Sequence, residues 1–367
     1  MPQITPSVRV RPSPFYEAAL ADGMTTASVY NHMIMPTGYG DPEAEYWRLI
    51  EGVSQWDVGV ERQVQLKGPD AARLAQILCT RDLSKCAVGQ GKYVAICDHD
   101  GTILNDPIIL KLADDTFWLS IADSDMRLWA KAVAAERGLD VEVTEPDVSP
   151  MAIQGPKAAD VVAKVCGEWV RELKYFWFRE AEIEGIPVAV QRSGWSKQGG
   201  FEIYLRDGTQ GMRLWEIFKQ AGEPFGIGPG APATAERFES GLVSAGADTD
   251  DRTNPYEINM GRYIDLHVPD DTIGIQALRK IAETGPTRQL LGVLFDAGRV
   301  EASVPRLDVI THQGKVIGHL TNVIWSPRLQ RSIGYAMVSR SVTAGERIAV
   351  ERSDGPAGGT LATLPFL

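Results

Sequence analysis

Two stretches of the sequence echo each other, and this echo constrains the fold more than any other feature. They read VQLKGPDAARLAQIL at residues 64–78 and MAIQGPKAADVVAKV at residues 151–165. Each predicts a short strand, a Gly-Pro turn and an alanine-rich helix with Pro69 or Pro156 at its first position, where a missing N–H costs nothing. The echo favours two related units of mixed helix and sheet, with chance similarity of two strand-to-helix turns as the alternative.

The C-terminal part follows a different pattern. From about residue 286 onward, segments such as LLGVLFD and SIGYAMV predict short strands joined by glycine-containing turns. Residues 286–367 are therefore expected to form a separate all-β domain, a small barrel. With two α+β units in residues 1–285, the predicted fold class is α+β.

Composition excludes several classes of function. The chain has 367 residues and a formal net charge of -11, which argues against a general nucleic-acid binder because such proteins need a basic face. Its four cysteines form no CxxC pair and its five histidines are scattered, so no metal site or disulfide framework is predicted. The N-terminus lacks an apolar signal segment, and no uncharged apolar run is long enough to span a membrane. A cytoplasmic protein with reduced thiols and no membrane partner is expected.

The stretch RSGWSKQGGFEIYL, residues 192–205, combines glycines with an alternating strand pattern. Its alternation places Glu202 and Tyr204 on one face of a strand. The preceding glycines predict a turn that needs positive φ or lets something approach the backbone closely. The local alternative is a hairpin turn followed by an edge strand whose polar face lies in water.

A second candidate lies in GTILNDPIILKL, residues 101–112, where Asp106 interrupts an otherwise apolar, strand-like segment. An Asp before a proline commonly bonds to nearby backbone N–H groups in a turn. A carboxylate held in an apolar wall is costly unless it is paired or used, which is the functional interpretation. Both interpretations stay open on the local sequence. No Ser or Cys lies in a nucleophile-elbow sequence, so no nucleophile triad is predicted.

These segments, in this order, resemble a known family. YNHMIMP, LNDPIILKL, MAIQGPKA, RSGWSKQGGFEIY and NPYEINMGRYIDL look like the dimethylsulfoniopropionate demethylase branch of the glycine-cleavage aminomethyltransferase superfamily, and the match extends over almost the whole chain. The resemblance implies three subdomains arranged as a cloverleaf around a central hole that binds tetrahydrofolate. The third subdomain of that family is a β-barrel.

The resemblance also assigns roles to individual residues. Glu202 matches the residue that holds the pterin, and Asp106 matches the carboxylate close to the reactive folate nitrogens. The other matched or expected contacts are Tyr93 and Ser120 for the folate, Trp195 for folate and methyl donor, and Tyr204 and Tyr30 for the donor. The sequence differs from the family pattern at two places, and the resemblance gives no role to the residues found there. An arginine of the glycine-cleavage protein is missing upstream of Arg237, and Lys92 replaces the first residue of a tyrosine pair.

The function implied by the resemblance is a tetrahydrofolate-dependent methyltransferase. It is expected to demethylate dimethylsulfoniopropionate to methylmercaptopropionate and to form 5-methyltetrahydrofolate, so its partners are a small methyl donor and the folate. The alternatives are a demethylase of another donor (a methylated amine or aryl methyl ether), a glycine-cleavage-type aminomethyltransferase, and a non-catalytic folate-binding accessory protein. The oligomeric state, a homodimer among the options, is left open.

Overall fold

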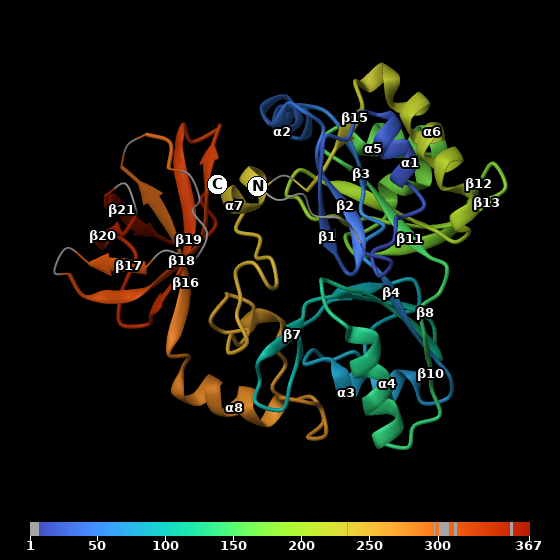
Figure 1. Ribbon diagram of the computed structural model, residues 1–367. Helices are drawn as coiled ribbons and strands as arrows, with labels where there is room; N and C mark the ends of the chain where they lie inside the picture. Colours follow the sequence, from blue (N-terminus) through green and yellow to red (C-terminus); the bar gives the residue numbers. More distant parts are fainter. Residues whose placement is uncertain (1–6, 233, 297, 301–307, 312–313, 353–354) are drawn as a thin grey trace. The chain divides into compact units, whose positions relative to one another are not determined.

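The computed structural model describes residues 7–232, 234–296, 298–300, 308–311, 314–352 and 355–367. The chain divides into two units, and Figure 1 shows the helices and strands of both, coloured along the sequence. Unit 1 consists of Met1–Ala75, Ser84–Tyr93 and Pro107–Ala233, and unit 2 consists of Gln76–Leu83, Val94–Asp106 and Thr234–Leu367.

Unit 1 contains two large sheets. The five-stranded antiparallel sheet has the order β10 (Glu142–Thr144), β4 (Gln63–Lys67), β9 (Thr116–Ser120), β8 (Ile108–Ala113) and β5 (Gly91–Tyr93). The six-stranded sheet has the order β12 (Phe178–Ile183), β13 (Ile186–Gln191), β14 (Gly200–Leu205), β11 (Ser149–Gln154), β3 (Ser54–Asp57) and β15 (Gly228–Gly230). A separate hairpin pairs β1 (Thr26–Tyr30) with β2 (Met33–Gly38).

The helices of unit 1 connect these strands. They are α1 (Tyr16–Ala21), α2 (Pro42–Glu51), α4 (Met126–Glu136), α5 (Ala158–Cys166) and α6 (Gly211–Gly222), with α3 (Ala71–Leu78) running from unit 1 into unit 2. Three short 3-10 helices are η1 (Glu168–Glu172), η2 (Gly208–Gln210) and η3 (Glu223–Phe225).

The two large sheets of unit 1 pack face to face. Leu110 and Trp118 of the five-stranded sheet form one apolar cluster with Ala189 and Tyr204 of the six-stranded sheet. The ring centroids of Trp118 and Tyr204 are 6.4 Å apart. The opposite face of β14, which carries Ile203, packs in a second core with α5 and α6. The six-stranded sheet is therefore covered on both sides, which explains why every residue of β14 is buried.

Both echoed stretches form a strand followed by a helix, as predicted: β4 precedes α3 and β11 precedes α5. The predicted position of the prolines is wrong, because Pro69 and Pro156 each lie two residues before the first helical residue. In each copy the N–H of the first helical alanine donates to the carbonyl of Gly68 or Gly155 at 3.0 Å. This turn occupies the Gly-Pro segment, so each helix begins only after it.

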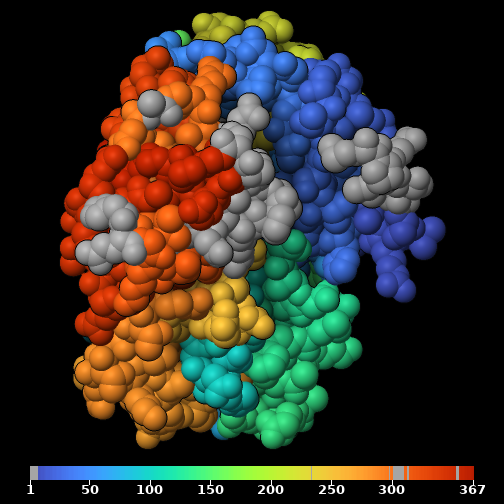
Figure 2. Space-filling view, turned by 60° about the vertical axis from the view of Figure 1, so that its left-hand side comes forward, coloured from blue at the N-terminus to red at the C-terminus, as the bar shows by residue number. Residues whose placement is uncertain are grey.

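Unit 2 contains the predicted barrel. Its six strands close in the order β16 (Arg288–Phe295), β19 (Arg331–Ser339), β18 (Val316–Ser326), β17 (Asp308–Thr311), β20 (Arg347–Val350) and β21 (Ala357–Ala362). The remaining elements are the pair β6 (Ile96–Cys97) and β7 (Ile103–Asn105), and the helices α7 (Thr234–Glu239), η4 (Gly261–Tyr263) and α8 (Ile275–Thr284). The space-filling view shows the barrel residues, coloured orange to red, packed as one body (Figure 2). The domain boundary expected at residue 286 falls between α8 and β16.

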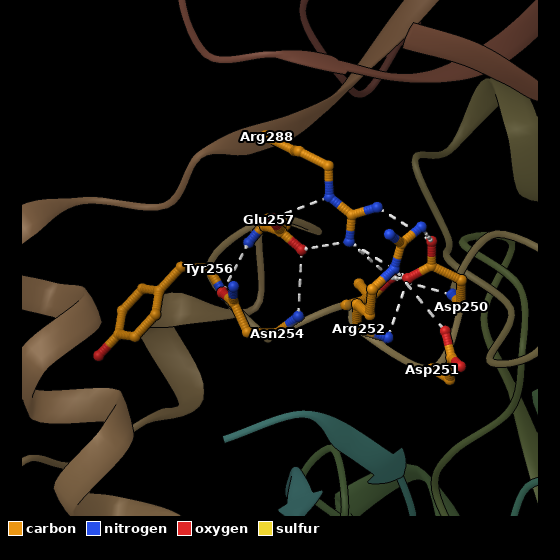
Figure 3. A network of polar contacts seen from close by, with 8 residues as sticks. Asp250, Asp251, Arg252, Asn254, Tyr256, Glu257 and Arg288 are labelled. Atoms are coloured by element: carbon orange, nitrogen blue, oxygen red, sulfur yellow. Dashed lines mark hydrogen bonds and ion pairs between the residues drawn. The ribbon is translucent and has the colours of Figure 1, made fainter. Parts of the chain in front are cut away.

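Arg288 ties the loop before η4 to the first barrel strand. Its guanidinium donates to both oxygens of Glu257 at 3.1 and 2.9 Å and to both oxygens of Asp250 at 2.9 and 3.2 Å (Figure 3). The hydrogen bond from Arg288 holds the pKa of Asp250 well below its usual range. A cavity of about 650 Å³ lies beside this network, lined among others by Arg252 and His319. Because nearly every Arg288 N–H is already used by the two carboxylates, its role is to fix this loop.

No helix in the described ranges is long and apolar enough to cross a membrane. Within the same ranges, no group of His, Cys, Asp and Glu side chains is arranged to hold a metal ion.

Candidate active site

The strand β14 presents its polar side chains to the interior of unit 1. The alternation predicted a shared face for Glu202 and Tyr204, and their side chains do meet, with the Tyr204 hydroxyl 3.1 Å from Glu202 Oε2. The alternative of a solvent-exposed polar face is wrong: Glu202 is 3% exposed and Tyr204 is 0% exposed. The reason is the second sheet, which covers this face through Trp118.

Six polar side chains gather between the two sheets, and we call them the intersheet cluster. They are Gln63 and Ser120 from the five-stranded sheet, and Gln191, Ser193, Glu202 and Tyr204 from β13, β14 and the loop that joins them. All six are buried. They belong together because strand register places Gln63 opposite Ser120 and Gln191 opposite Glu202.

Hydrogen bonds join the polar groups of the intersheet cluster. Gln63 Nε2 donates to Ser120 Oγ at 2.9 Å. The Tyr204 and Ser193 hydroxyls lie 3.1 and 2.5 Å from Glu202 Oε2. Two hydroxyls thus meet on one carboxylate oxygen.

Glu202 is a carboxylate without a compensating cation. Burial raises its pKa, and the hydrogen bonds from Ser193 and Tyr204, which lower it, do not offset the burial. Within the part of the chain that the structure describes, no ion pair reaches it. Burial, followed by the neighbouring charge of Glu202, likewise raises the pKa of Tyr204 well above its usual range. The site is therefore rich in acceptors and poor in positive charge.

Gln63 supplies a further acceptor. Its Oε1 is buried and has no hydrogen-bond partner among the described residues. An amide flip does not remove the problem, because the nitrogen already donates to the carbonyl of Glu61 at 2.7 Å. A buried acceptor left without a donor costs about 1–3 kcal/mol. Gln63 and Glu202 together suit a ligand that presents N–H groups.

Gly194 in the 192–199 loop and Gly200 at the start of β14 make room for a protein side chain. Gln154, at the end of β11, is wholly buried beneath this loop; its Nε2 donates to the Ser193 carbonyl at 3.0 Å and its Oε1 accepts from Ser196 at 2.8 Å. A Cβ added to Gly194 would lie 1.9 Å from Gln154 Nε2, and one added to Gly200 would lie 2.4 Å away. Close approach was predicted correctly from the glycines, and the group that approaches both of them is the Gln154 amide.

The other aromatic candidates lie elsewhere in unit 1. Trp195 is half-buried in the 192–199 loop, two residues after Ser193, and Tyr93 is half-buried at the end of β5. Tyr30 is half-buried at the end of β1, in the separate hairpin. The structure thus joins Glu202 and Tyr204 by a hydrogen bond and places Ser120, bonded to Gln63, in the same buried cluster.

Asp106 belongs to unit 2 and is half-buried. It follows β7, which ends at Asn105, and precedes β8, which begins at Ile108. The expectation of one continuous strand is therefore corrected: the chain leaves the strand conformation at Asp106-Pro107, where proline removes a backbone donor.

The structure also shows where Arg237 and Lys92, which the resemblance left without a role, lie. Arg237 is buried in unit 2, where it forms an ion pair with Asp248 at 2.6 Å. Lys92 is half-buried on β5, opposite Ile109 of β8.

The sequence did not point to Gln63, Gln191, Ser193 or Gln154. A usable signal existed for Gln191, because a hairpin joining residues 186–191 to 200–205 places it across from Glu202. Gln63 and Ser120 belong to strands far apart in the sequence, so only the sheet pairing brings them together.

Comparisons with known proteins agree with this architecture. The family described as the GCVT N-terminal domain matches residues 15–268, and the glycine cleavage T-protein C-terminal barrel domain matches residues 288–367. A solved structure, the glycine cleavage system aminomethyltransferase T from Bartonella henselae, has the same fold with a TM-score of 0.84, covering 97% of this chain and 98% of that chain at 22% identity.

Curated relatives resemble the chain over most of its length. It is 41% identical over 356 residues to a dimethylsulfoniopropionate demethylase from Ruegeria pomeroyi, covering 97% of each protein. It is 33% identical over 313 residues to an aminomethyltransferase from Clostridium botulinum strain 657, covering 83% of each. The chain therefore belongs to the glycine cleavage T-protein family, whose members are transferases that use tetrahydrofolate as co-substrate.

Proposed function

We propose that this protein transfers a methyl group from dimethylsulfoniopropionate to tetrahydrofolate. The products are methylmercaptopropionate and 5-methyltetrahydrofolate. The observation that carries the proposal is the buried, acceptor-rich intersheet cluster around Glu202, in a chain 41% identical to a dimethylsulfoniopropionate demethylase. The reduced pterin of tetrahydrofolate carries N–H groups that would donate to Glu202 and to the unpartnered Gln63 Oε1. The residues present therefore fit this ligand.

The reaction needs alignment and exclusion of water more than bond activation. In a sulfonium the S–CH₃ bond breaks with its electron pair left on sulfur, so a neutral thioether departs while tetrahydrofolate N5 forms the new N–CH₃ bond. Holding the two partners in line removes much of the entropic cost of a bimolecular step. We assign to Glu202 the task of fixing the pterin.

Asp106 and Trp195 receive the other two tasks in this proposal. Methylated N5 must lose its proton, and the carboxylate of Asp106 is the acceptor, directly or through water. The sulfonium is a soft cation that an aromatic face attracts, and the indole of Trp195 supplies that face. Tyr93 and Ser120 complete the folate site, and Tyr30 is assigned to the methyl donor. The Tyr204 ring, wholly buried against Trp118, supports Glu202 through its hydroxyl.

We place the reaction in the cytoplasm. The structure has no disulfide among its described cysteines, which fits a reducing compartment.

The decisive experiment incubates the purified protein with tetrahydrofolate and a panel of methyl donors. Formation of both 5-methyltetrahydrofolate and methylmercaptopropionate, detected by mass spectrometry, is expected with dimethylsulfoniopropionate. Turnover of a methylated amine or aryl methyl ether in its place would reassign the donor within the same chemistry.

The second candidate is glycine-cleavage-type aminomethyl transfer, favoured by the aminomethyltransferases of 30–33% identity among the relatives. An assay with an aminomethylated lipoyl carrier protein separates the two. Release of ammonia with formation of methylenetetrahydrofolate would support this candidate, and folate binding without turnover of any donor would support an accessory role.

A further inference from the structure

Four oxygen atoms around Glu202 form a closed ring of hydrogen bonds. Ser193 Oγ lies 2.5 Å from Glu202 Oε2 and 3.1 Å from Gln191 Oε1. The Tyr204 hydroxyl lies 3.1 Å from each of the same two oxygens. Two hydroxyl donors thus face two acceptors, one a carboxylate and the other an amide carbonyl, and all four residues are buried.

The number of hydrogens in the ring decides which acceptor each hydroxyl can donate to. Each hydroxyl has one hydrogen and can donate to only one acceptor at a time. When Glu202 is ionised, one hydroxyl donates to the carboxylate, and the other is shared between the carboxylate and Gln191 Oε1. The 2.5 Å separation favours Ser193 as the donor to the carboxylate, since hydroxyl-to-carboxylate bonds are this short.

The ring stays satisfied when Glu202 gains a proton. The carboxylic acid then donates to Ser193 Oγ, and both hydroxyls turn to Gln191 Oε1, which has two lone pairs. The orientation of Gln191 is fixed for this purpose, because its Nε2 donates to the carbonyl of Phe176 at 3.2 Å. Gln191 is thus the alternative acceptor that releases the hydroxyls from Glu202.

The two oxygens of Glu202 are used unequally. Among the described residues, the hydrogen bonds to this carboxylate from Ser193 and Tyr204 both end on Oε2. Oε1 accepts none of them. The ring therefore orients the carboxylate through one oxygen and leaves the other to a ligand.

We propose that Ser193, Gln191 and Tyr204 are positioning residues that set the protonation state of Glu202 and reserve its Oε1 for an N–H group of the folate. Ser193 and Tyr204 stabilise the anion, and Gln191 competes with it for their hydroxyl hydrogens. The identity of the ligand as a folate rests on the proposed function. The effect of the ring on the protonation state of Glu202 does not depend on that function.

The proposal predicts opposite effects from neighbouring substitutions. Ser193→Ala and Tyr204→Phe each remove a donor to the anion, so the pH at which Glu202 ionises should rise by about one unit. Gln191→Met removes the competing acceptor and forces both hydroxyls onto the carboxylate, so that pH should fall. Loss of packing alone would not produce shifts of opposite sign.

The first measurement uses the full chain without ligand. Carbon-13 NMR of the glutamate side-chain carboxyl groups follows ionisation with pH, and the spectrum of Glu202→Gln identifies the Glu202 signal. Ser196→Ala is the matched control, because Ser196 is a buried serine of the same loop that bonds to Gln154. It should leave the Glu202 titration unchanged, and Ser193→Thr, which keeps the hydroxyl, should restore the wild-type titration.

The second measurement is tetrahydrofolate affinity by calorimetry over the same pH range. Ser193→Ala should raise Kd about tenfold at a pH between the titration midpoints measured for Glu202 in wild type and variant, and less at a pH above both midpoints. Shifts of the same sign for Ser193→Ala and Gln191→Met, or an equal shift for Ser196→Ala, would overturn the inference. Failure of the wild-type protein to bind tetrahydrofolate, with the predicted titrations intact, would overturn the proposed function and the folate clause alone.

Discussion

Arg237 and Asp248 form an ion pair that is buried on both sides. Arg237 Nη1 lies 2.6 Å from Asp248 Oδ2, and the side chains are 5% and 0% exposed. The guanidinium carbon also lies 4.1 Å from the centroid of the Phe238 ring. Asp248 accepts in addition from the backbone N–H of Ser244 and from the Thr321 hydroxyl of β18. Arg237 is thus committed to holding α7 and the following loop against the barrel within unit 2.

Removing Arg237 should unfold the protein at a lower temperature. Arg237→Met leaves the Asp248 charge buried and unpaired, which costs about 3–5 kcal/mol. Arg252→Met is the matched control, because the Arg252 side chain is 78% exposed and its ion-pair distances are 3.5 and 3.8 Å. Thermal denaturation should show a large fall in Tm for the first variant and almost none for the second. Equal Tm values would contradict a structural role for Arg237.

Asp57 should make stability fall as pH rises from 3.8, its unfolded pKa, to about 6, its folded pKa. Burial raises its pKa from 3.8 to about 6, although Ser13 and the Gly59 N–H donate to the carboxylate. Folding therefore favours the protonated form, so this contribution is complete below the unfolded value and is lost as pH passes 6. The full difference corresponds to about 3 kcal/mol. The Tm of wild type minus that of Asp57→Asn should decrease between pH 4.5 and 7.5.

Ser13→Ala tests the cause of the Asp57 effect. It removes the hydroxyl that lies 2.6 Å from the carboxylate, so the pKa of Asp57 should rise further and the loss of stability should move to higher pH. A Tm difference between wild type and Asp57→Asn that is constant with pH would contradict both expectations.

Gln154 should control the order of the 192–199 loop. Gln154→Leu keeps the volume beneath Gly194 but removes the bonds to the Ser193 carbonyl and the Ser196 hydroxyl. The backbone amides of the loop should then exchange with solvent faster, and folate affinity should fall because Trp195 and Ser193 lose their support. Hydrogen exchange followed by mass spectrometry measures the effect. Unchanged exchange in the loop would show that its glycine turns hold it without Gln154.

Local patterns in the sequence predicted those features that depend on a few neighbouring residues. The alternation of β14 placed Glu202 beside Tyr204, the two echoed stretches formed strand and helix, and the C-terminal strands formed a closed barrel. In each case the period of apolar residues or a turn of Gly and Pro encodes the element directly.

Features that depend on pairing between distant strands could not be predicted in this way. The alternation predicts which residues share a face but not what covers that face. The face of Tyr204 is covered by a second sheet through Trp118. The glycines also do not reveal which group approaches them: it is Gln154, which lies 40 residues before Gly194 and 46 before Gly200. The helical pattern likewise placed Pro69 at the helix start because the intervening turn has no period of its own.

Asp106 should matter for turnover more than for folding. Asp106→Asn keeps the size and most hydrogen-bonding capacity of the side chain while it removes the charge, so kcat should fall by about two powers of ten or more with little change in Tm. Steady-state kinetics and thermal denaturation on the same preparation measure both. The alternative of a turn-stabilising Asp predicts the reverse, a lower Tm with kcat retained.

Trp195→Leu tests the aromatic face proposed for the sulfonium. Leucine keeps an apolar side chain in the half-buried position of Trp195 but deletes the π-face. Loss of about 1–2 kcal/mol of cation–π attraction should raise KM for dimethylsulfoniopropionate by about one power of ten, while folate affinity falls less. Trp195→Phe, which retains a weaker π-face, should give an intermediate KM. If both variants keep the wild-type KM, or if the wild-type enzyme prefers an uncharged aryl methyl ether, Trp195 does not bind a cationic donor and the donor assignment fails with it.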